Sequence, residues 1–221
     1  MDLKPSPERQ ILFDTLTKYF ENEYKLADRN TAAHSELGYS KEAWERMRDL
    51  GILESLIDPE LNGFGGTPLD ISAVFEALGR GLVVEPFLET GLVSTKILGK
   101  GNENQKKLVA DLLENIALPT FCHSENDTDY RKSYVKTKLV PDKEGNFLVT
   151  GEKVMIKNAS GASHLIITCR SSGDYADEKG ITIACIPSNR SGIDIKSFSS
   201  IDGGRVSDIH LENVAVLKTE I

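Results

Sequence analysis

The 221-residue sequence predicts an α+β fold, in which an all-helical N-terminal domain is followed by a β-sandwich or β-barrel domain. Two observations predict this class. Apolar residues recur at helical spacing in the first half, whereas short apolar runs with no helical pattern between them fill the second half. Because the pattern changes near residue 117, we expect a helical domain over residues 1–117 and a β domain over residues 118–221.

The first half predicts a series of amphipathic helices. Ser40 has the position of an N-cap, and Gly51 that of a left-handed residue after a helix end. Thr67 and Pro68 have the pattern of an N-cap followed by the first helical residue. The apolar positions that define these helices are Ile11, Leu12, Leu16, Tyr19 and Phe20, then Trp44, Met47 and Leu50, and then Ile71, Val74, Phe75 and Leu78, with two more helices expected near 90–98 and 103–115.

The second half predicts short strands joined by turns. The turn-rich segment 141–146 lies between two apolar runs, which is typical of a hairpin. Strands at this spacing favour a sandwich or a barrel. The strands are expected near residues 135–140, 147–150, 154–156, 164–169, 181–186, 193–195 and 209–216.

Composition excludes several classes of function. The net charge is −8, and Lys and Arg form no cluster, so a nucleic-acid partner is not expected. No apolar run approaches the roughly 20 residues of a membrane span, and the N-terminal segment lacks the apolar core of a signal peptide. The three cysteines are widely spaced, which predicts a reduced, cytoplasmic protein.

Familiar catalytic motifs are missing from the sequence. The glycine-rich segment 61–66 lacks the dinucleotide-binding spacing and follows no strand, so we interpret it as a loop before a helix. The four histidines are scattered, and no metal site is expected. Cys122 and His123 are adjacent, and neighbours in a strand point to opposite faces, so they are not expected to form a catalytic pair.

Five segments, in order, resemble motifs of the acyl-CoA dehydrogenase family. No single segment is specific, but their order on a helix-then-strand background indicates this family. Its members have an N-terminal helical domain, a middle β domain and a C-terminal helical bundle. The matching segments are 51–66, Phe75–Arg80 (like Glu-x-Leu-Gly-Arg), Phe121–Glu125 (like Ala-x-Thr-Glu-Pro), Gly151–Ala159 (like Gly-x-Lys-x-Trp-Ile-Thr-Asn-Ala) and Arg205–Asp208 (like Arg-x-Ser-Asp).

The resemblance implies a flavoprotein that oxidises the α,β-bond of an acyl-CoA thioester, with FAD as the hydride acceptor. It also implies a homo- or hetero-oligomer with a chain that carries a C-terminal helical bundle. The residues at the matching positions are Ser124, Thr128, Met155, Ile156 and Lys157 for cofactor binding, and Glu125 and Asp129 for the substrate.

The sequence departs from the family pattern within these motifs. Met155 stands where the family has an aromatic residue, and Lys157 where it has a hydroxyl. Met155 is either a contact to the flavin ring or a core residue, and Lys157 is either a ligand donor or a solvated strand residue. A polar stretch, 126–130, replaces the family's glycine-rich loop, and Arg205 with Asp208 is expected to form a structural ion pair.

No residue is assigned as the catalytic base, because the family's base belongs to the C-terminal bundle, which we expect to be absent here. The leading hypothesis is therefore an acyl-CoA dehydrogenase, or a subunit of one, that needs a partner or a bundle to act. The alternative is a non-catalytic structural or binding subunit that has lost its flavin. A flavin monooxygenase or oxidase on the same fold is a third hypothesis.

Overall fold

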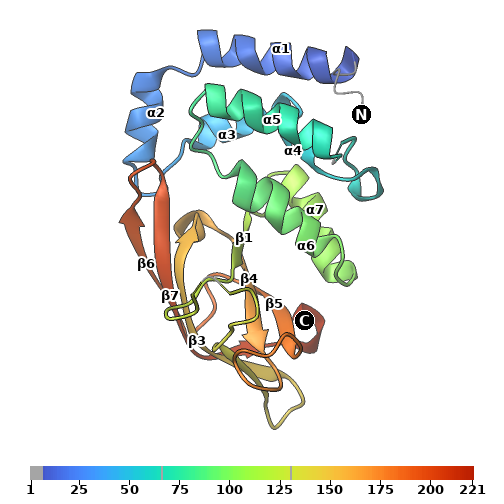
Figure 1. Ribbon diagram of the computed structural model, residues 1–221, viewed down its shortest axis with the longest axis vertical. Helices are drawn as coiled ribbons and strands as arrows, with labels where there is room; N and C mark the ends of the chain where they lie inside the picture. The colour runs from blue at the N-terminus through green and yellow to red at the C-terminus, as the bar shows by residue number, and fades with distance from the viewer. Residues whose placement is uncertain (1–6, 66, 130) are drawn as a thin grey trace.

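The structure is a computed structural model that describes residues 7–65, 67–129 and 131–221. The N-terminal segment 1–6, Gly66 of the first family-like segment and Tyr130 of the polar stretch lie outside the described residues. Helices form the first half and a curled sheet forms the second (Figure 1), so the predicted fold class is confirmed. None of the described helices is both long and apolar enough to cross a membrane.

The helical half has more elements than the sequence pattern predicted. The segments Leu26–Ala33 and Ile52–Leu56 were not predicted, because each is too short to show a clear period. The α-helices are α1 (Pro7–Asn22), α2 (Leu26–Ala33), α3 (Lys41–Asp49), α4 (Ile52–Leu56), α5 (Pro68–Arg80), α6 (Thr95–Leu98) and α7 (Glu103–Leu113), with a π-helix over Phe87–Ser94 that leads directly into α6.

Predicted capping residues start and end these helices. The Ser40 hydroxyl accepts the Ala43 N–H at 3.2 Å, at the start of α3. The Thr67 hydroxyl accepts the Asp70 N–H, and the Asp70 carboxylate accepts the Thr67 N–H, which completes a capping box for α5. Gly51 follows α3 with a φ of +89°, as expected of a left-handed residue at a helix end.

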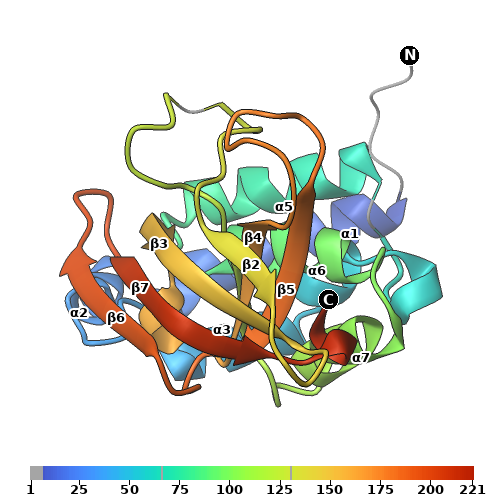
Figure 2. The ribbon, with the colours of Figure 1, turned by 90° about the horizontal axis from the view of Figure 1, so that it is seen from below.

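The strands form one mixed, curled sheet. Their order is β1-β4-β2-β3-β7-β6, and β5 pairs with β4. Figure 2 shows β3, β7 and β6 crossing in front of the helices when the molecule is seen from below. The strands are β1 (Pro119–Cys122), β2 (Lys138–Pro141), β3 (Phe147–Lys157), β4 (His164–Arg170), β5 (Ile181–Pro187), β6 (Ile193–Ser199) and β7 (Arg205–Val216).

Two differences from the predicted strands have physical causes. The runs 147–150 and 154–156 are one strand, β3, because the polar residues between them keep pairing with β7. β1 pairs in parallel with β4, a long-range contact that no local pattern encodes. The predicted domain boundary at residue 117 lies in the connection between α7 and β1.

Alternating side chains of the sheet join two cores. Leu165 and Ile167 of β4 belong to the core inside the curled sheet, whereas Ile166 between them packs with the helices. The helices therefore cover one face of β4 and β5, where Cys185 also joins the helical core. This packing fixes the helical half against the sheet.

The helices and the β6–β7 turn also meet through close polar contacts. Arg29 of α2 donates to the carbonyl of Leu82 and to that of Asp202, both at 2.9 Å. Gly38 approaches Arg205 so closely that a Cβ at Gly38 would lie 2.6 Å from the Arg205 Cγ, and its φ is +80°. Glycine is required there for both reasons, and the contact closes one side of a cavity.

Candidate functional site

Strand β3 carries a β-bulge at the predicted cofactor segment. Between the pairs Lys153–Ile209 and Ile156–Ser207, two residues of β3 oppose one residue of β7. Met155 is one of the two and has a φ of +56°, which is uncommon for a residue with a side chain. Its N–H donates to the Asp208 carboxylate at 3.1 Å. The bulge turns the Met155 side chain outward, and 65% of the residue is exposed.

Lys157, two residues farther along β3, lies beside the β6–β7 turn. Its ammonium is 2.6 Å from the Asp202 carboxylate, and both side chains are partly exposed. The turn is also tied to α2, because the Asp202 carbonyl accepts from Arg29. Lys157 is therefore neither a core residue nor a freely solvated one; it links the strand to the junction with the helices.

The other predicted cofactor residues lie in different environments. Ser124 is exposed. Its carbonyl accepts the Val154 N–H at 2.8 Å, which places Ser124 beside β3. Thr128 is buried, and its hydroxyl donates to the Glu125 carbonyl at 2.9 Å. Ile156 is buried in the core of the sheet. We name Ser124, Met155 and Lys157 the β3 strip, because these three present atoms to the surface.

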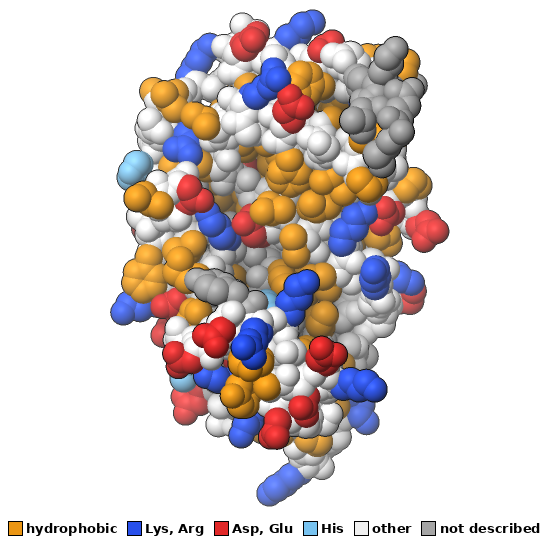
Figure 3. Space-filling model, in the orientation of Figure 1, with side chains coloured by type: hydrophobic (Ala, Val, Ile, Leu, Met, Phe, Trp, Pro, Cys, Tyr) orange, Lys and Arg blue, Asp and Glu red, His pale blue; other side chains and the backbone are white. Residues whose placement is uncertain are grey.

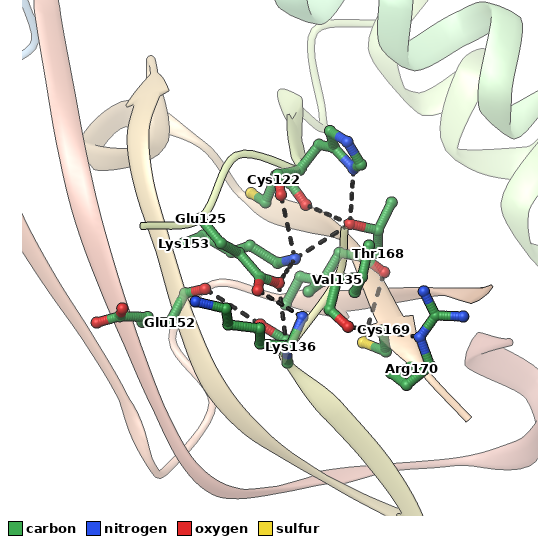
Figure 4. A network of polar contacts seen from close by, with 12 residues as sticks. Cys122, Glu125, Val135, Lys136, Glu152, Lys153, Thr168, Cys169 and Arg170 are labelled. Carbon is green, nitrogen blue, oxygen red and sulfur yellow. Dashed lines mark hydrogen bonds and ion pairs between the residues drawn. The ribbon is translucent and has the colours of Figure 1, made fainter. Parts of the chain in front are cut away.

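A buried ion pair lies directly behind the β3 strip. The Lys153 ammonium is 2.6 Å from the Glu125 carboxylate, and the two side chains are 0% and 1% exposed. Lys153 also donates to the Thr168 hydroxyl at 3.1 Å and to the His123 carbonyl at 3.3 Å. Glu125 accepts the N–H groups of Lys136 and Thr137 as well. Figure 4 shows Glu125, Lys153, Thr168 and Lys136 close together in this network.

The electrostatics of this pair follow from burial and contact. Burial raises the pKa of Glu125, but the charge of Lys153 and the hydrogen bonds outweigh it and hold that pKa below its usual 4.5. Burial also lowers the pKa of Lys153, and Glu125 opposes that shift. The pair joins the segment after β1 to β3, at the place where the Ser124 carbonyl accepts the Val154 N–H.

Two acidic residues have surroundings that differ from those expected. Glu125 was expected to contact the substrate; its side chain is 1% exposed and is engaged by Lys153 and by two backbone N–H groups, and its role in substrate binding stays a prediction. Arg205 and Asp208 were expected to pair, but among the described residues Arg205 donates to Ser199, and Asp208 accepts from Met155. Asp129 is exposed, with a φ of +50°, and its role in substrate binding stays a prediction.

A cavity of about 390 Å³ opens where the helices meet the sheet. Figure 3 shows the surface hollowed between the two halves, with hydrophobic side chains gathered around the hollow. The β3 strip reaches this junction cavity at Lys157. Its apolar lining is contributed by the helical half: Leu37, Phe75, Leu78, Leu82, Val83, Val84, Phe87 and Leu88.

Two carboxyls in the junction cavity were missed by the sequence analysis. Glu85 is buried and accepts from the Tyr24 hydroxyl at 2.7 Å and from the Ser40 N–H at 3.2 Å. Glu89 lies on the π-helix, opposite Lys157. Burial raises the pKa of both carboxyls. A signal was present, since Glu85 and Glu89 interrupt an apolar run, but only the fold shows that they share a cavity.

The π-helix brings Glu89 to that position. Ser94 donates to the Glu89 carbonyl at 2.6 Å, and Thr95 donates to the Gly91 carbonyl at 2.6 Å. These hydroxyls satisfy carbonyls in a widened helix, and such helices are frequent at functional sites.

The structure also tests the other candidate chemistries. Cys122 is fully buried, and burial raises the pKa of its thiol to about 12, so it is not a nucleophile. Within the described ranges, His, Cys, Asp and Glu form no group that could hold a metal ion.

The FAD implied by the family resemblance fits the surface of the β3 strip. Met155 offers an exposed, polarizable side chain to a ring, and the Ser124 hydroxyl lies on the neighbouring segment. The Thr128 hydroxyl and the Ile156 side chain are directed elsewhere, so they are not part of this surface. The contact area with a ring is smaller than an aromatic residue would give.

Comparison with known families agrees with the fold. The sequence pattern of "Acyl-CoA dehydrogenase, N-terminal domain" matches residues 6–113, and that of "Acyl-CoA dehydrogenase, middle domain" matches residues 120–214. The chain belongs to the acyl-CoA dehydrogenase family, a family of oxidoreductases.

Individual relatives show the same relation. A probable short/branched chain specific acyl-CoA dehydrogenase of Dictyostelium discoideum is 26% identical over 186 residues, 77% of this chain and 45% of that protein. The solved glutaryl-coenzyme A dehydrogenase in its glutaryl-CoA complex has a TM-score of 0.85 at 26% identity, over 100% of this chain and 57% of that one.

A third relative is similar in fold alone. The ChsE4–ChsE5 complex of Mycobacterium tuberculosis contains a chain with a TM-score of 0.84 at 18% identity, over 100% of this chain and 58% of that one. The present chain spans about half the length of the curated relative and of these solved chains.

Proposed function

We propose that this chain is the acyl-binding and flavin-facing part of an acyl-CoA dehydrogenase. In this proposal the acyl group of an acyl-CoA enters the junction cavity, and the ring of FAD lies against the β3 strip. FAD, when bound, supplies the hydride acceptor for oxidation of the α,β-bond. The chain's own residues bind the acyl group, orient it and exclude water around it.

One observation carries this proposal: the junction cavity and the β3 strip meet at Lys157. The helical wall of the cavity offers apolar contact to an acyl chain, whereas β3 offers the exposed Met155. An acyl group in the cavity is thereby adjacent to a ring on the strip. Neither half of the molecule forms this arrangement alone.

The catalytic base is proposed to lie outside the described residues. Proton removal beside a thioester needs a base held within hydrogen-bond reach of the reacting carbon. Glu125 is used inside the protein, Glu85 is bonded to Tyr24, and Asp202 is paired with Lys157. Glu89 is the remaining carboxyl of the cavity lining, and in this proposal it binds the ligand rather than removing the proton. We propose that the base belongs to a C-terminal helical bundle, in the same protein or in a partner chain. The ChsE4–ChsE5 complex supports a partner as the source, through fold similarity alone.

Acyl-CoA binding tests this function through a cavity-filling variant. A Cβ at Gly79 of α5 would meet no atom within 4 Å, so there is space to begin a side chain there, and Gly79→Leu adds one to the cavity lining. We expect it to weaken hexanoyl-CoA binding by about tenfold in titration calorimetry. Ser72→Leu, two turns earlier on the same helix and outside the cavity lining, is the matched control. Equal weakening by both variants, or no binding to the original chain, would contradict the proposal.

A second candidate function is a structural or binding subunit without flavin. Two observations favour it: Met155 replaces an aromatic residue, and the Lys157 ammonium is engaged by Asp202. Titration with FAD, followed by flavin fluorescence, separates the two functions. A chain that takes up no FAD, alone or with its native partner, supports the structural subunit.

A further inference from the structure

The junction cavity has a balanced set of charges. Its described lining contains three cationic side chains and three carboxyls: Arg29, Lys157 and Arg205, and Glu85, Glu89 and Asp202. A ligand group with a full charge would upset this balance inside a partly buried site, where an unpaired charge is costly. The cavity therefore favours a neutral group.

Glu89 is the carboxyl of the cavity that no side chain of the described residues engages. Lys157 opposes the rise of its pKa, but the ammonium of Lys157 is already 2.6 Å from Asp202. The Glu89 carboxyl is bonded to its own backbone N–H, and the residue is half-buried. Because a carboxylate can accept several hydrogen bonds, a ligand donor in the cavity can add one.

Three residues of the cavity lining each have a buried polar atom without a partner. These atoms are the Tyr39 hydroxyl, the Asn158 Oδ1 and the Arg205 Nε, and each is buried without a hydrogen bond in the described structure. Tyr39 is 4% exposed and Asn158 is 6% exposed. Buried polar atoms normally have partners. These three atoms are an acceptor, a donor and a hydroxyl that can serve as either.

We propose that the junction cavity selects acyl groups that carry a hydroxyl. This inference rests on the proposed function and names the class of its substrate. A hydroxyl is neutral, donates a hydrogen bond to the Glu89 carboxyl or to Asn158 Oδ1, and accepts one from Arg205 Nε or Tyr39. A ketone or a carboxylate has no proton to donate, and an ammonium has no lone pair to accept with.

Three ligands of equal chain length test the inference on the original chain: hexanoyl-CoA, its analogue with a terminal hydroxyl, and adipoyl-CoA. In titration calorimetry the hydroxyl analogue is expected to bind about five- to tenfold more tightly than hexanoyl-CoA. Equal binding of these two, or tightest binding of adipoyl-CoA, overturns the inference while leaving the proposed function intact. If none of the three binds, the proposed function itself fails.

Substitutions in the cavity lining test which side chains are responsible for the preference for a hydroxyl, measured as the ratio of the affinities for the hydroxyl analogue and hexanoyl-CoA. Glu89→Leu is expected to lower the ratio of the two affinities to near one, because the hydroxyl loses its acceptor. Glu60→Leu, an exposed change outside the cavity lining, is expected to leave the ratio unchanged. Tyr39→Phe removes only a hydroxyl and should lower the ratio in part, whereas Tyr19→Phe, in the helical core, should not. A ratio that persists in both Glu89→Leu and Tyr39→Phe overturns the assignment to this cavity.

Discussion

Lys153 and Lys157 lie four residues apart on β3, and each places its ammonium 2.6 Å from a carboxylate. Their surroundings are opposite. Lys153 and Glu125 have essentially no exposed side-chain surface, whereas the Lys157 and Asp202 side chains are 38% and 63% exposed. The same chemical pair therefore serves two purposes. The first holds the sheet together, and the second lies on the rim of the junction cavity.

The comparison indicates that burial, and not the distance between the charges, decides how much an ion pair contributes to the stability of the fold. In water, Coulomb attraction at this separation is weak and screened by salt. Inside the sheet each charge has lost its hydration, so removing one partner leaves the other unpaired and costly. Hydrogen bonds replace the lost hydration: the Lys153 ammonium donates to three acceptors, and the Glu125 carboxylate accepts from three donors.

The largest expected effect comes from breaking the buried pair. Lys153→Met should lower the free energy of unfolding by about 3–5 kcal/mol, because Glu125 would remain buried without its cation. Urea denaturation followed by circular dichroism measures this change. Lys138→Met, an exposed change on β2, is the control. A loss below about 1 kcal/mol would show that water or a rearranged group replaces Lys153.

The buried carboxylate should also give stability a dependence on pH. Since the folded pKa of Glu125 lies below 4.5, its ionised form stabilises the fold above that pH, and the contribution is lost as pH falls through the lower folded pKa. The stability difference between the original chain and Glu125→Gln should therefore shrink on acidification. Denaturation at several pH values measures it, and a constant difference would contradict the assignment.

A smaller effect is expected on the exposed side of β3. Met155→Trp should strengthen FAD binding several-fold, since an aromatic face adds about 1 kcal/mol of stacking. Quenching of flavin fluorescence gives the affinity. Val140→Trp, at another exposed apolar position, should have no effect. Unchanged or weaker FAD binding by a folded Met155→Trp variant would show that the Met155 side chain does not face a flavin.

The smallest effect is expected at the exposed pair. Lys157→Met should change the free energy of unfolding by less than about 1 kcal/mol, because water solvates Asp202 when its partner is lost. High salt screens the exposed pair, so the stability difference between the original chain and Lys157→Met should be smaller still when the urea denaturation is repeated at high salt. If Lys157→Met lowered the free energy of unfolding as much as Lys153→Met, burial would not explain the difference between the two ion pairs.

Local patterns in the sequence were sufficient for much of the fold. The helical period, the caps at Ser40 and Thr67 and the glycine at position 51 depend on neighbours within one or two turns, and the structure confirms them. The change from a helical to a strand pattern near residue 117 predicted the α+β fold class, which the structure also confirms, because this pattern too is local. The order of five family-like segments identified the family before any contact was known.

The site required contacts between distant segments. The sequence placed Glu125 at the substrate because the residue is acidic and lies beside a family motif, but the fold turns it toward Lys153, 28 residues away. Glu89 was not singled out in the sequence, and only the fold brings it into the same cavity as Lys157.

The sequence by itself determined the helix-then-strand order and the family. The order follows from short-range periodicity, and the family follows from five short motifs that occur in the expected order. Only the tertiary structure decided which of the two lysines on β3 is buried, which way Met155 faces and which carboxyls share the cavity. The physical reason is that burial and pairing depend on which segments the sheet register and the helix packing bring together. At the one-residue bulge in β3, Met155 is exposed while Lys153 and Ile156 on either side are buried.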